Sequence, residues 1–317
     1  MNRPRILRRA LHGVLLFDKS VGVSSNDALQ QVKRLFRAEK AGHTGTLDPL
    51  ASGLLPICFG AATKFSHASL DADKRYRATL RLGVTTTTGD CEGALVDERP
   101  VQVDRTTIVA ACARFLGAGW QTPPMHSALK HNGRALYEYA RDGIDVPRAP
   151  RPVTVHALDV VGYDGTTLEL DITCGKGTYI RTLAEDLGLA LGCGAYLSAL
   201  RRTAVGGFGV EQAVTLEALQ TRSEAQRDEL VRVVDCLLAE QPAIRLNDSE
   251  AARFLTGLRR RVDLRDAPIV RVYGPPPQDT TGGVDADVFL GSAHVAGGEL
   301  IADRLLSPLE IQTLVRT

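Results

Sequence analysis

The chain has 317 residues, of which 44% are hydrophobic and 24% charged, and its formal net charge is +1. This length allows two domains, the composition is ordinary for a soluble globular protein, and the charge argues against a uniformly basic nucleic-acid binder. No apolar run is long enough to cross a bilayer and the basic segment 1–9 lacks the apolar stretch of a signal peptide, so we expect a cytoplasmic protein without membrane contact.

Apolar periodicity in the first three quarters of the chain predicts both helices and strands. Ser24, Ser25 or Asn26 offers an N-cap for a helix, and Leu168 begins a run in which apolar and polar residues alternate. We expect helices at 24–36, at 106–116 and after the 175–177 turn, and strands at 76–84 and 168–174. This mixture predicts an α+β domain around a mixed or antiparallel sheet flanked by helices.

The last quarter of the chain predicts a small, separate, β-rich domain. Residues 215–240 resemble a charged helical connection, and Asn247 or Asp248 can cap a helix that ends at Gly257, with Glu250 placed for a capping box. Strand-like runs follow at 269–273, 288–292 and 299–304, and a Gly- and Pro-rich loop at 274–287 interrupts them. We therefore expect domains at 1–240 and 243–317.

Positive charge is concentrated in two segments. Residues 1–40 carry nine Lys or Arg against three acidic residues, and residues 253–271 carry six Arg, including Arg259–Arg261, against two Asp. Residues 215–250, with eight acidic and four basic side chains, offset this excess. The basic segments suit a phosphate backbone, although each could equally be an ordinary solvated face.

Metal and cofactor motifs do not stand out in the sequence. The six cysteines form no CxxC pair, which favours reduced and mostly buried thiols, and the seven histidines have no HExxH or similar spacing. No GxxxxGK[ST] loop is present, and no second carboxylate stands out as a partner for Asp48 in a glycosidase. We expect no metal and no cofactor.

Residues 43–56, His-Thr-Gly-Thr-Leu-Asp-Pro-Leu-Ala-Ser-Gly-Leu-Leu-Pro, contain the most informative motif. They place Asp48 in a turn bounded by Gly45, Pro49 and Gly53 among leucines. Asp often forms turns through bonds to its own backbone, but in a partly dry setting a carboxylate is costly unless a cation pairs with it. Asp48 is thus either a turn former or a reactive group on a rigid loop.

The motifs of the chain, taken together and in order, resemble those of the TruB-type tRNA pseudouridine synthases. Besides residues 43–56, the matching segments are 13–20, 62–65, 73–78, 82–83, 121–130, 136–141, 175–181, 192–195 and 200–202. The resemblance implies a pseudouridine-synthase catalytic domain over 1–240 and, less specifically, a PUA-like RNA-binding domain over 243–317. It implies isomerisation of uridine to pseudouridine at position 55 in the T-loop of tRNA.

The resemblance also implies roles for individual residues. Asp48 is the expected nucleophile, Arg181 its cationic partner, and Tyr76 an aromatic that stacks on the uracil and could assist proton removal. From the sequence alone, Arg181 could instead pair with Glu185 at i+4 on a helix surface. The other expected substrate contacts are Tyr179 at the pocket, Leu200 as its apolar wall, His43 on RNA bases, and Lys64 and Lys19 on phosphates.

The expected partner is tRNA, through its T-arm and acceptor stem. Segment 121–152, with its arginines and tyrosines, resembles the insertion that grips the T-arm, although a surface helix with a Pro-rich exit would have the same composition. We expect a monomer with no obligatory protein partner. The alternatives are a non-catalytic RNA-binding or RNA-folding protein and a guide-RNA-dependent pseudouridine synthase subunit.

Overall fold

The computed structural model describes residues 7–277 and 287–316. The strands of its first sheet are β1 (Gly13–Lys19), β2 (Ala41–His43), β3 (Ala51–Phe59), β4 (Lys74–Leu82), β7 (Gly117–Gln121), β10 (Arg151–Tyr163), β11 (Thr167–Cys174), β12 (Ala195–Val205), β13 (Phe208–Gly209) and β14 (Val214–Thr215). Those of the second are β15 (Ala243–Arg245), β16 (Arg260–Arg261), β17 (Ala267–Gly274), β18 (Val288–Ala296) and β19 (Glu299–Leu305). Two small hairpins are β5 (Val84–Thr86) with β6 (Leu95–Glu98), and β8 (Lys130–His131) with β9 (Arg134–Ala135).

The α-helices are α1 (Ser25–Leu35), α2 (Ser66–Asp71), α3 (Arg105–Ala113), α4 (Leu136–Arg141), α5 (Ile180–Ala190), α6 (Leu216–Gln220), α7 (Glu224–Asp228), α8 (Asp248–Leu255) and α9 (Pro308–Arg316). Short 3₁₀ turns are η1 (Gly60–Phe65), η2 (Val210–Gln212) and η3 (Cys236–Leu238). Within the described ranges, no helix is long and apolar enough to cross a membrane.

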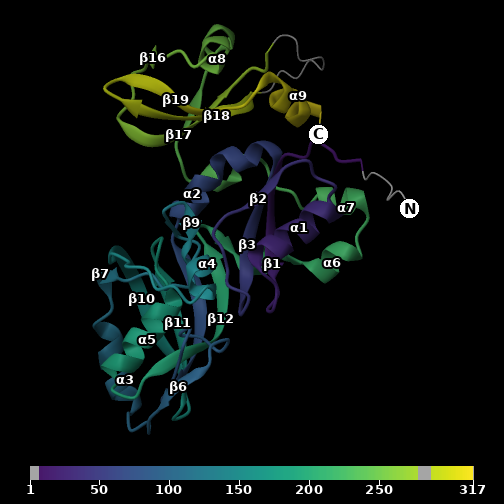
Figure 1. Ribbon diagram of the computed structural model, residues 1–317. Coiled ribbons are helices and arrows are strands. Elements are labelled where there is room, and N and C mark those ends of the chain that lie inside the picture. Colours follow the sequence, from purple (N-terminus) through teal and green to yellow (C-terminus); the bar gives the residue numbers. More distant parts are fainter. Residues whose placement is uncertain (1–6, 278–286, 317) are drawn as a thin grey trace.

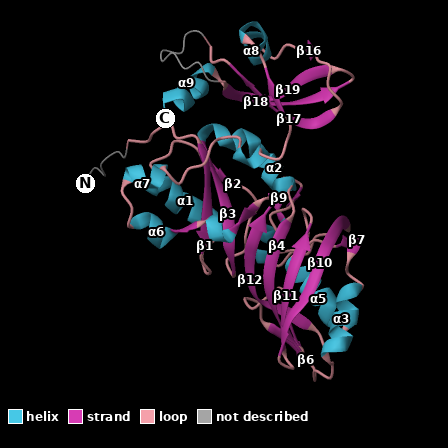
Figure 2. Cartoon of the chain, turned by 180° about the vertical axis from the view of Figure 1, so that it is seen from behind, coloured by secondary structure: helices cyan, strands magenta, loops and turns pink. Residues whose placement is uncertain are grey.

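The large sheet mixes parallel and antiparallel strands. Its order over the described residues is β14-β1-β3-β12-β4-β11-β10-β7, with β2 beside β3 and β13 beside β12. Most neighbours are antiparallel, but β12 runs parallel to β3 and β14 runs parallel to β1. Helices α3 and α5 cover the β10–β4 half of this sheet (Figures 1 and 2). The expected α+β class is confirmed.

One face of the large sheet carries the apolar residues that the sequence pattern assigned to it. On β4, Ala78, Leu80 and Leu82 are buried and pack with residues of α3 and α5. Tyr76 lies on the same face but contacts both this cluster and the one beneath α1. The alternation of β4 therefore brings Tyr76 to the middle of the sheet, where the two clusters meet.

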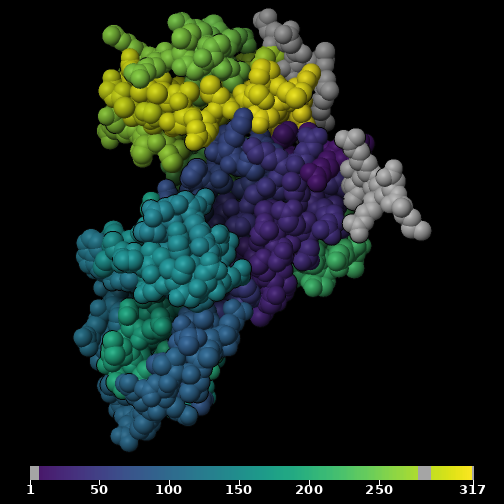
Figure 3. Space-filling view, in the orientation of Figure 1, coloured from purple at the N-terminus to yellow at the C-terminus, as the bar shows by residue number. Residues whose placement is uncertain are grey.

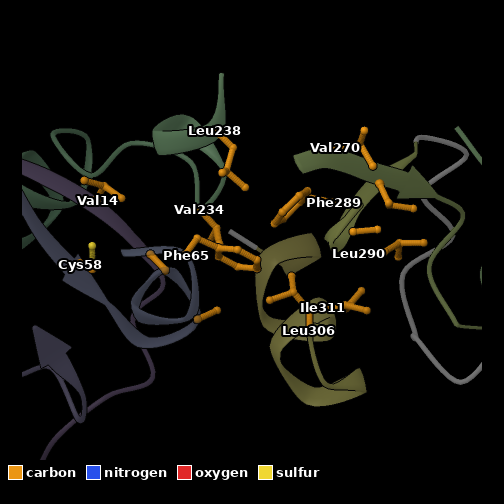
Figure 4. Packing of buried hydrophobic residues seen from close by; sticks show 14 of the residues in the cluster. Val14, Cys58, Phe65, Val234, Leu238, Val270, Phe289, Leu290, Leu306 and Ile311 are labelled. Carbon is orange, nitrogen blue, oxygen red and sulfur yellow. The ribbon is translucent and has the colours of Figure 1, made fainter. Parts of the chain in front are cut away.

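The second sheet is not an independent appendage. Its apolar residues form one continuous cluster with Val14, Cys58 and Phe65 of the first part of the chain. The Phe65 ring meets the Phe289 ring edge to face at 5.1 Å, and Ile311 of α9 lies beside them (Figure 4). Figure 3 shows the second sheet seated on the N-terminal part of the molecule.

Most expected elements are found with shifts of one or two residues. Ser24 caps α1 by accepting from the Asp27 amide, and Asn247 and Glu250 form the expected capping box on α8. Helix α3 begins after the Asp104 cap, and the segment 215–240 contains the short helices α6 and α7. The three strand-like runs of the last quarter are β17, β18 and β19.

Two features differ from the sequence-based expectation, and a third cannot be compared with it. The strand expected at 76–84 ends at Leu82, because Gly83 has a φ of +84° and Val84 starts the separate β5–β6 hairpin. Helix α9 was not expected, although Ser307 and Glu310 form a capping box at its start: the Ser307 hydroxyl accepts from the Glu310 amide, and the Glu310 carboxylate accepts from the Ser307 amide. Most of the 274–287 loop, residues 278–286, lies outside the described residues.

Candidate active site

A cavity of about 590 Å³ opens between the 45–48 loop, the start of α5 and the beginning of the 121–152 segment. The expected site residues Asp48, Tyr76, Tyr179, Arg181 and Leu200 all line it. They come from four separate parts of the sequence, and the folding of the sheet brings them together.

The Asp48 loop is anchored on both sides. The Ser25 hydroxyl of α1 accepts from the Leu47 amide at 2.8 Å and donates to the Leu47 carbonyl at 2.9 Å. The Asp48 carbonyl accepts from the Ala51 amide at 3.0 Å, which closes the turn into β3. These main-chain bonds fix the loop without using the Asp48 carboxylate, whose side chain remains 38% exposed.

Arg181 is the cationic partner of that carboxylate. Its Nη2 lies 3.0 Å from Asp48 Oδ2 and donates to the His126 carbonyl at 2.5 Å. Its Nη1 lies 3.5 Å from Asp90 Oδ2. Among the described residues these two aspartates are its ion-pair partners, and Glu185, the alternative from helix spacing, is not paired with it. The guanidinium is thus shared by two carboxylates in a nearly dry position, with 5% of its side chain exposed.

Burial and charge act in opposite directions on Asp48. Burial raises the pKa of Asp48 above its ordinary value, Arg181 lowers it, and the negative charge of Asp90 raises it again. Lys19 also lowers the pKa of Asp48. A carboxylate held by one shared cation and left partly accessible is less stabilised than one in a closed ion pair, and it is therefore suited to react.

Arg202, which the sequence-based reasoning did not single out, lies beneath this arrangement. It is 1% exposed, and it donates to the Leu54 carbonyl at 2.7 Å and to the Gly45 carbonyl at 2.9 Å. Burial raises the pKa of Tyr76, and the adjacent Arg202 guanidinium opposes that rise. One buried cation thus supports both the Asp48 loop and the Tyr76 hydroxyl.

Two further cavity residues complete the walls. Leu200 pairs across the sheet with Ala78 of β4 and Ala51 of β3, so its side chain lies on the same face as Tyr76. Tyr179 is the N-cap residue of α5, and burial raises the pKa of its phenol. The cavity therefore offers aromatic and aliphatic surface around a carboxylate, which suits a flat, weakly polar ring with a polar edge.

Three expected contact residues lie outside the cavity lining. His43 is on β2; burial and Arg202 lower its pKa, and its Nδ1 is buried without a hydrogen-bond partner among the described residues. Lys19 is fully buried and donates to the Ser20 and Val23 carbonyls, while burial lowers its pKa to about 8. The Lys19 ammonium is therefore held by main-chain carbonyls within the protein.

Lys64, expected to contact a phosphate, is bound to other parts of the chain. Its Nζ lies 2.6 Å from Glu310 of α9 and 2.9 Å from the Leu305 carbonyl. Both partners belong to the last quarter of the chain. The sequence could not reveal this, because the two partners lie more than 240 residues from Lys64.

Asp90 is the second residue that sequence reasoning missed. It is 3% exposed, accepts from the Thr88 hydroxyl at 2.5 Å and from the Glu92 amide at 3.1 Å, and faces Arg181. Its segment Thr-Gly-Asp-Cys-Glu-Gly is that of an ordinary Asx turn. No local sequence pattern distinguishes an aspartate that only forms a turn from one that also pairs with a distant arginine.

Segment 121–152 contributes the loop His126–Leu129 to the cavity, followed by the β8–β9 hairpin and α4. Its aromatic and basic side chains partly pair with one another: Arg134 stacks on Tyr139 at 4.6 Å, and Arg141 on Tyr137 at 5.2 Å. The segment is thus a folded lobe and not only a surface helix.

The arginine cluster of the last quarter, Arg259–Arg261, lies beside a groove of about 410 Å³. Arg260 pairs with Glu250 at 2.5 Å and Arg259 with Glu299 at 3.5 Å. Part of the positive charge is therefore neutralised within the domain, and the cluster is less basic than its sequence indicates.

Family models match most of the chain. The model described as the N-terminal domain of the TruB family pseudouridylate synthases matches residues 33–180, and that of the tRNA pseudouridylate synthase B C-terminal domain matches residues 181–239. The protein named tRNA pseudouridine synthase B of Burkholderia lata is 53% identical, with 96% of this chain and 93% of that protein covered. Its namesake in Verminephrobacter eiseniae is 51% identical, with 99% and 94% covered.

Solved structures agree on the fold. A chain in the crystal structure of a Cbf5-Nop10-Gar1 complex superposes with a TM-score of 0.71 at 24% identity, covering 95% of this chain and 87% of that one. A chain of an archaeal box H/ACA sRNP Nop10-Cbf5 complex gives 0.69 at 23% identity, covering 96% and 88%. The resemblance drawn from the motifs is confirmed: the chain belongs to the TruB family of pseudouridylate synthases.

Proposed function

We propose that the protein is a tRNA pseudouridine synthase that isomerises uridine 55 in the T-loop. The observation that carries the proposal is the Asp48–Arg181 pair at 3.0 Å, in which the partly exposed Asp48 carboxylate lines a cavity with an aromatic and an aliphatic wall. The relatives named tRNA pseudouridine synthase B support the substrate class.

Asp48 is the proposed nucleophile. Its carboxylate adds to the nucleoside, and the bond between ribose and the uracil nitrogen breaks. The base turns over and bonds to the ribose through carbon, and the bond to the carboxylate breaks, which frees Asp48. The proton lost from that carbon is balanced by one gained at the freed uracil nitrogen. Reactant and product have the same atoms and oxidation state, so the reaction requires no redox cofactor and no co-substrate. Arg181 keeps the carboxylate ionised and oriented, because an adjacent cation favours the charged form.

Tyr76, Tyr179 and Leu200 are the proposed walls for the uracil. A uridine inside a folded loop must leave its stack to reach Asp48, which costs a few kcal/mol. Aromatic surface at Tyr76 and the apolar side chain of Leu200 offset that cost by burying the extruded base. His43, at the N-terminal side of the Asp48 loop, is proposed to contact neighbouring bases of the RNA.

We propose residues 1–240 as the catalytic domain, with 121–152 as the lobe that grips the T-arm, and 243–317 as a PUA-like RNA-binding domain. Lys130 and Arg151 of the lobe are exposed and suit phosphate contacts. For Lys19 and Lys64 we propose support of the fold in place of phosphate contact, because both are bound to main-chain carbonyls.

The test is pseudouridine formation in an unmodified tRNA transcript by purified protein, without metal, nucleotide, guide RNA or second protein. We expect modification at position 55 by the wild type and none by Asp48→Asn, with tRNA binding retained. Asp171→Asn is the matched control, since Asp171 is 39% exposed and pairs with Arg77 but lies outside the cavity. Tight binding without product from the wild type would favour a guide-dependent subunit or a non-catalytic RNA-binding protein.

A further inference from the structure

Gln121 is a buried polar residue that the proposed mechanism does not use. It is the last residue of β7, at the edge of the large sheet and the first position of the 121–152 segment, and it is 6% exposed. Its carboxamide makes two hydrogen bonds with a single residue 58 positions away, Tyr179. The Tyr179 amide donates to Oε1 at 2.8 Å, and Nε2 donates to the Tyr179 carbonyl at 3.1 Å.

The Gln121 carboxamide bonds both backbone groups of Tyr179, as a residue of a neighbouring β-strand would. An amide side chain that satisfies both the N–H and the C=O of one residue fixes the position and the rotation of that peptide segment. Tyr179 is the N-cap of α5, and its own side chain makes no capping hydrogen bond to the helix. The first amides of a helix have no partner within the helix, so an external anchor has most effect on position there.

Arg181 lies in the first turn of α5, two residues after Tyr179. The same 121–152 segment reaches it a second time, through the His126 carbonyl that accepts from Nη2 at 2.5 Å. The segment therefore holds the start of α5 at two points, one on the backbone of Tyr179 and one on the guanidinium that faces Asp48.

We propose that Gln121 is a positioning residue that sets Arg181 against Asp48 by fixing the start of α5 to the base of the RNA-gripping segment. This inference rests on the proposed function, because the reaction is what requires the Asp48–Arg181 geometry. Gln121 is not a catalytic residue, since its bonds are to the Tyr179 backbone.

Gln121→Met tests the proposal, because it keeps the length of the side chain and removes both hydrogen bonds. We expect kcat for pseudouridine formation in a tRNA transcript to fall roughly 10- to 100-fold, the size of effect that follows from small misplacement of a reacting group. KM should stay within about threefold. Gln121→Glu keeps the acceptor for the Tyr179 amide and loses the donor, so it should also lower kcat. This second variant provides the test if Gln121→Met does not fold.

A second readout separates positioning from simple loss of stability. The charged groups facing the Asp48 carboxylate are Arg181, Asp90 and Lys19. A shift of Arg181 away from Asp48 raises the pKa of Asp48, so the acid limb of kcat in Gln121→Met should move to higher pH. Lower stability alone would leave that limb in place.

The matched control is Gln212→Met, which removes one hydrogen bond, to Arg232, outside the cavity. We expect wild-type kcat and an unchanged acid limb for it. Wild-type kcat and acid limb in both Gln121 variants would overturn the positioning role, and so would a rise in KM without a change in kcat. A wild-type protein that forms no pseudouridine would instead refute the proposed function.

Discussion

Replacing Arg181 by methionine should reveal how much the shared guanidinium contributes. The change removes the pairing with Asp48 at 3.0 Å and Asp90 at 3.5 Å, and the hydrogen bonds to the Thr88 and His126 carbonyls. Asp90 is then left without its cation in a position that is 3% exposed.

The structure allows an estimate of the cost. Removing one partner of a buried ion pair destabilises a protein by about 3–5 kcal/mol. Asp48 is 38% exposed and can be rehydrated, whereas Asp90 cannot, so we expect about 2–4 kcal/mol. For a chain of 317 residues that lowers Tm by roughly 3–6 °C.

The acid limb of the pH–rate profile gives a sharper test, because two variants should move it in opposite directions. Arg181 lowers the pKa of Asp48 and Asp90 raises it. If ionised Asp48 is the reactive form, Arg181→Met moves the acid limb to higher pH and Asp90→Asn moves it to lower pH. Measuring kcat and Tm across pH for both variants checks this. An acid limb that falls at the wild-type pH in both variants would refute the electrostatic reasoning about Asp48.

Two further predictions concern the framework of the site. Gly53→Ala should lower the free energy of unfolding by at least about 2 kcal/mol and reduce activity, because φ is +105° and a Cβ would lie 2.2 Å from the Arg202 carbonyl oxygen. Gly22→Ala is the control, because Gly22 also has a positive φ, +84°, but has open space for a Cβ, so it shows the effect of backbone strain alone. Phe65→Ala should cost about 3–5 kcal/mol and make the last quarter of the chain more sensitive to proteolysis, since Phe65 is 3% exposed against Phe289. Equal melting temperatures for the two glycine variants, or a proteolysis pattern unchanged by Phe65→Ala, would contradict these two arguments.

The packing of the second sheet also affects how it can be studied. Deleting residues after 243 would uncover Phe65, Val234 and Leu238, each 3% exposed in the whole chain. Loss of activity on truncation would therefore mix lost RNA contact with lost stability. Charge substitutions at Arg261, which is exposed on the groove side, separate the two effects.

Local sequence was sufficient for elements whose signals lie within a few residues. The caps of α1 and α8 and the alternation of β4 depend on neighbours at i+2 to i+4, and the structure has them where the pattern predicted. Motif order was sufficient for the family and for Asp48, Tyr76, Tyr179, Arg181 and Leu200, which all line one cavity.

Other residues of the site required the tertiary structure. Asp90 has the sequence context of a turn and becomes a partner of Arg181 only because the 88–92 loop meets α5. The sequence around Arg202 would also fit an exposed residue. Arg202 lies beneath the Asp48 loop because β12 pairs in parallel with β3. The pairing of Lys64 with Glu310, 246 positions away, likewise exists only in the folded chain.

The sequence by itself therefore determined the helices and strands with clear local patterns, the family and the nucleophile candidate, because these depend on short-range spacing and on motif identity. The tertiary structure decided which charges share Arg181, which cations are buried, and that the second sheet shares a core with the first. Those properties depend on contacts between residues tens to hundreds of positions apart, and the burial that sets their strength exists only in the folded chain.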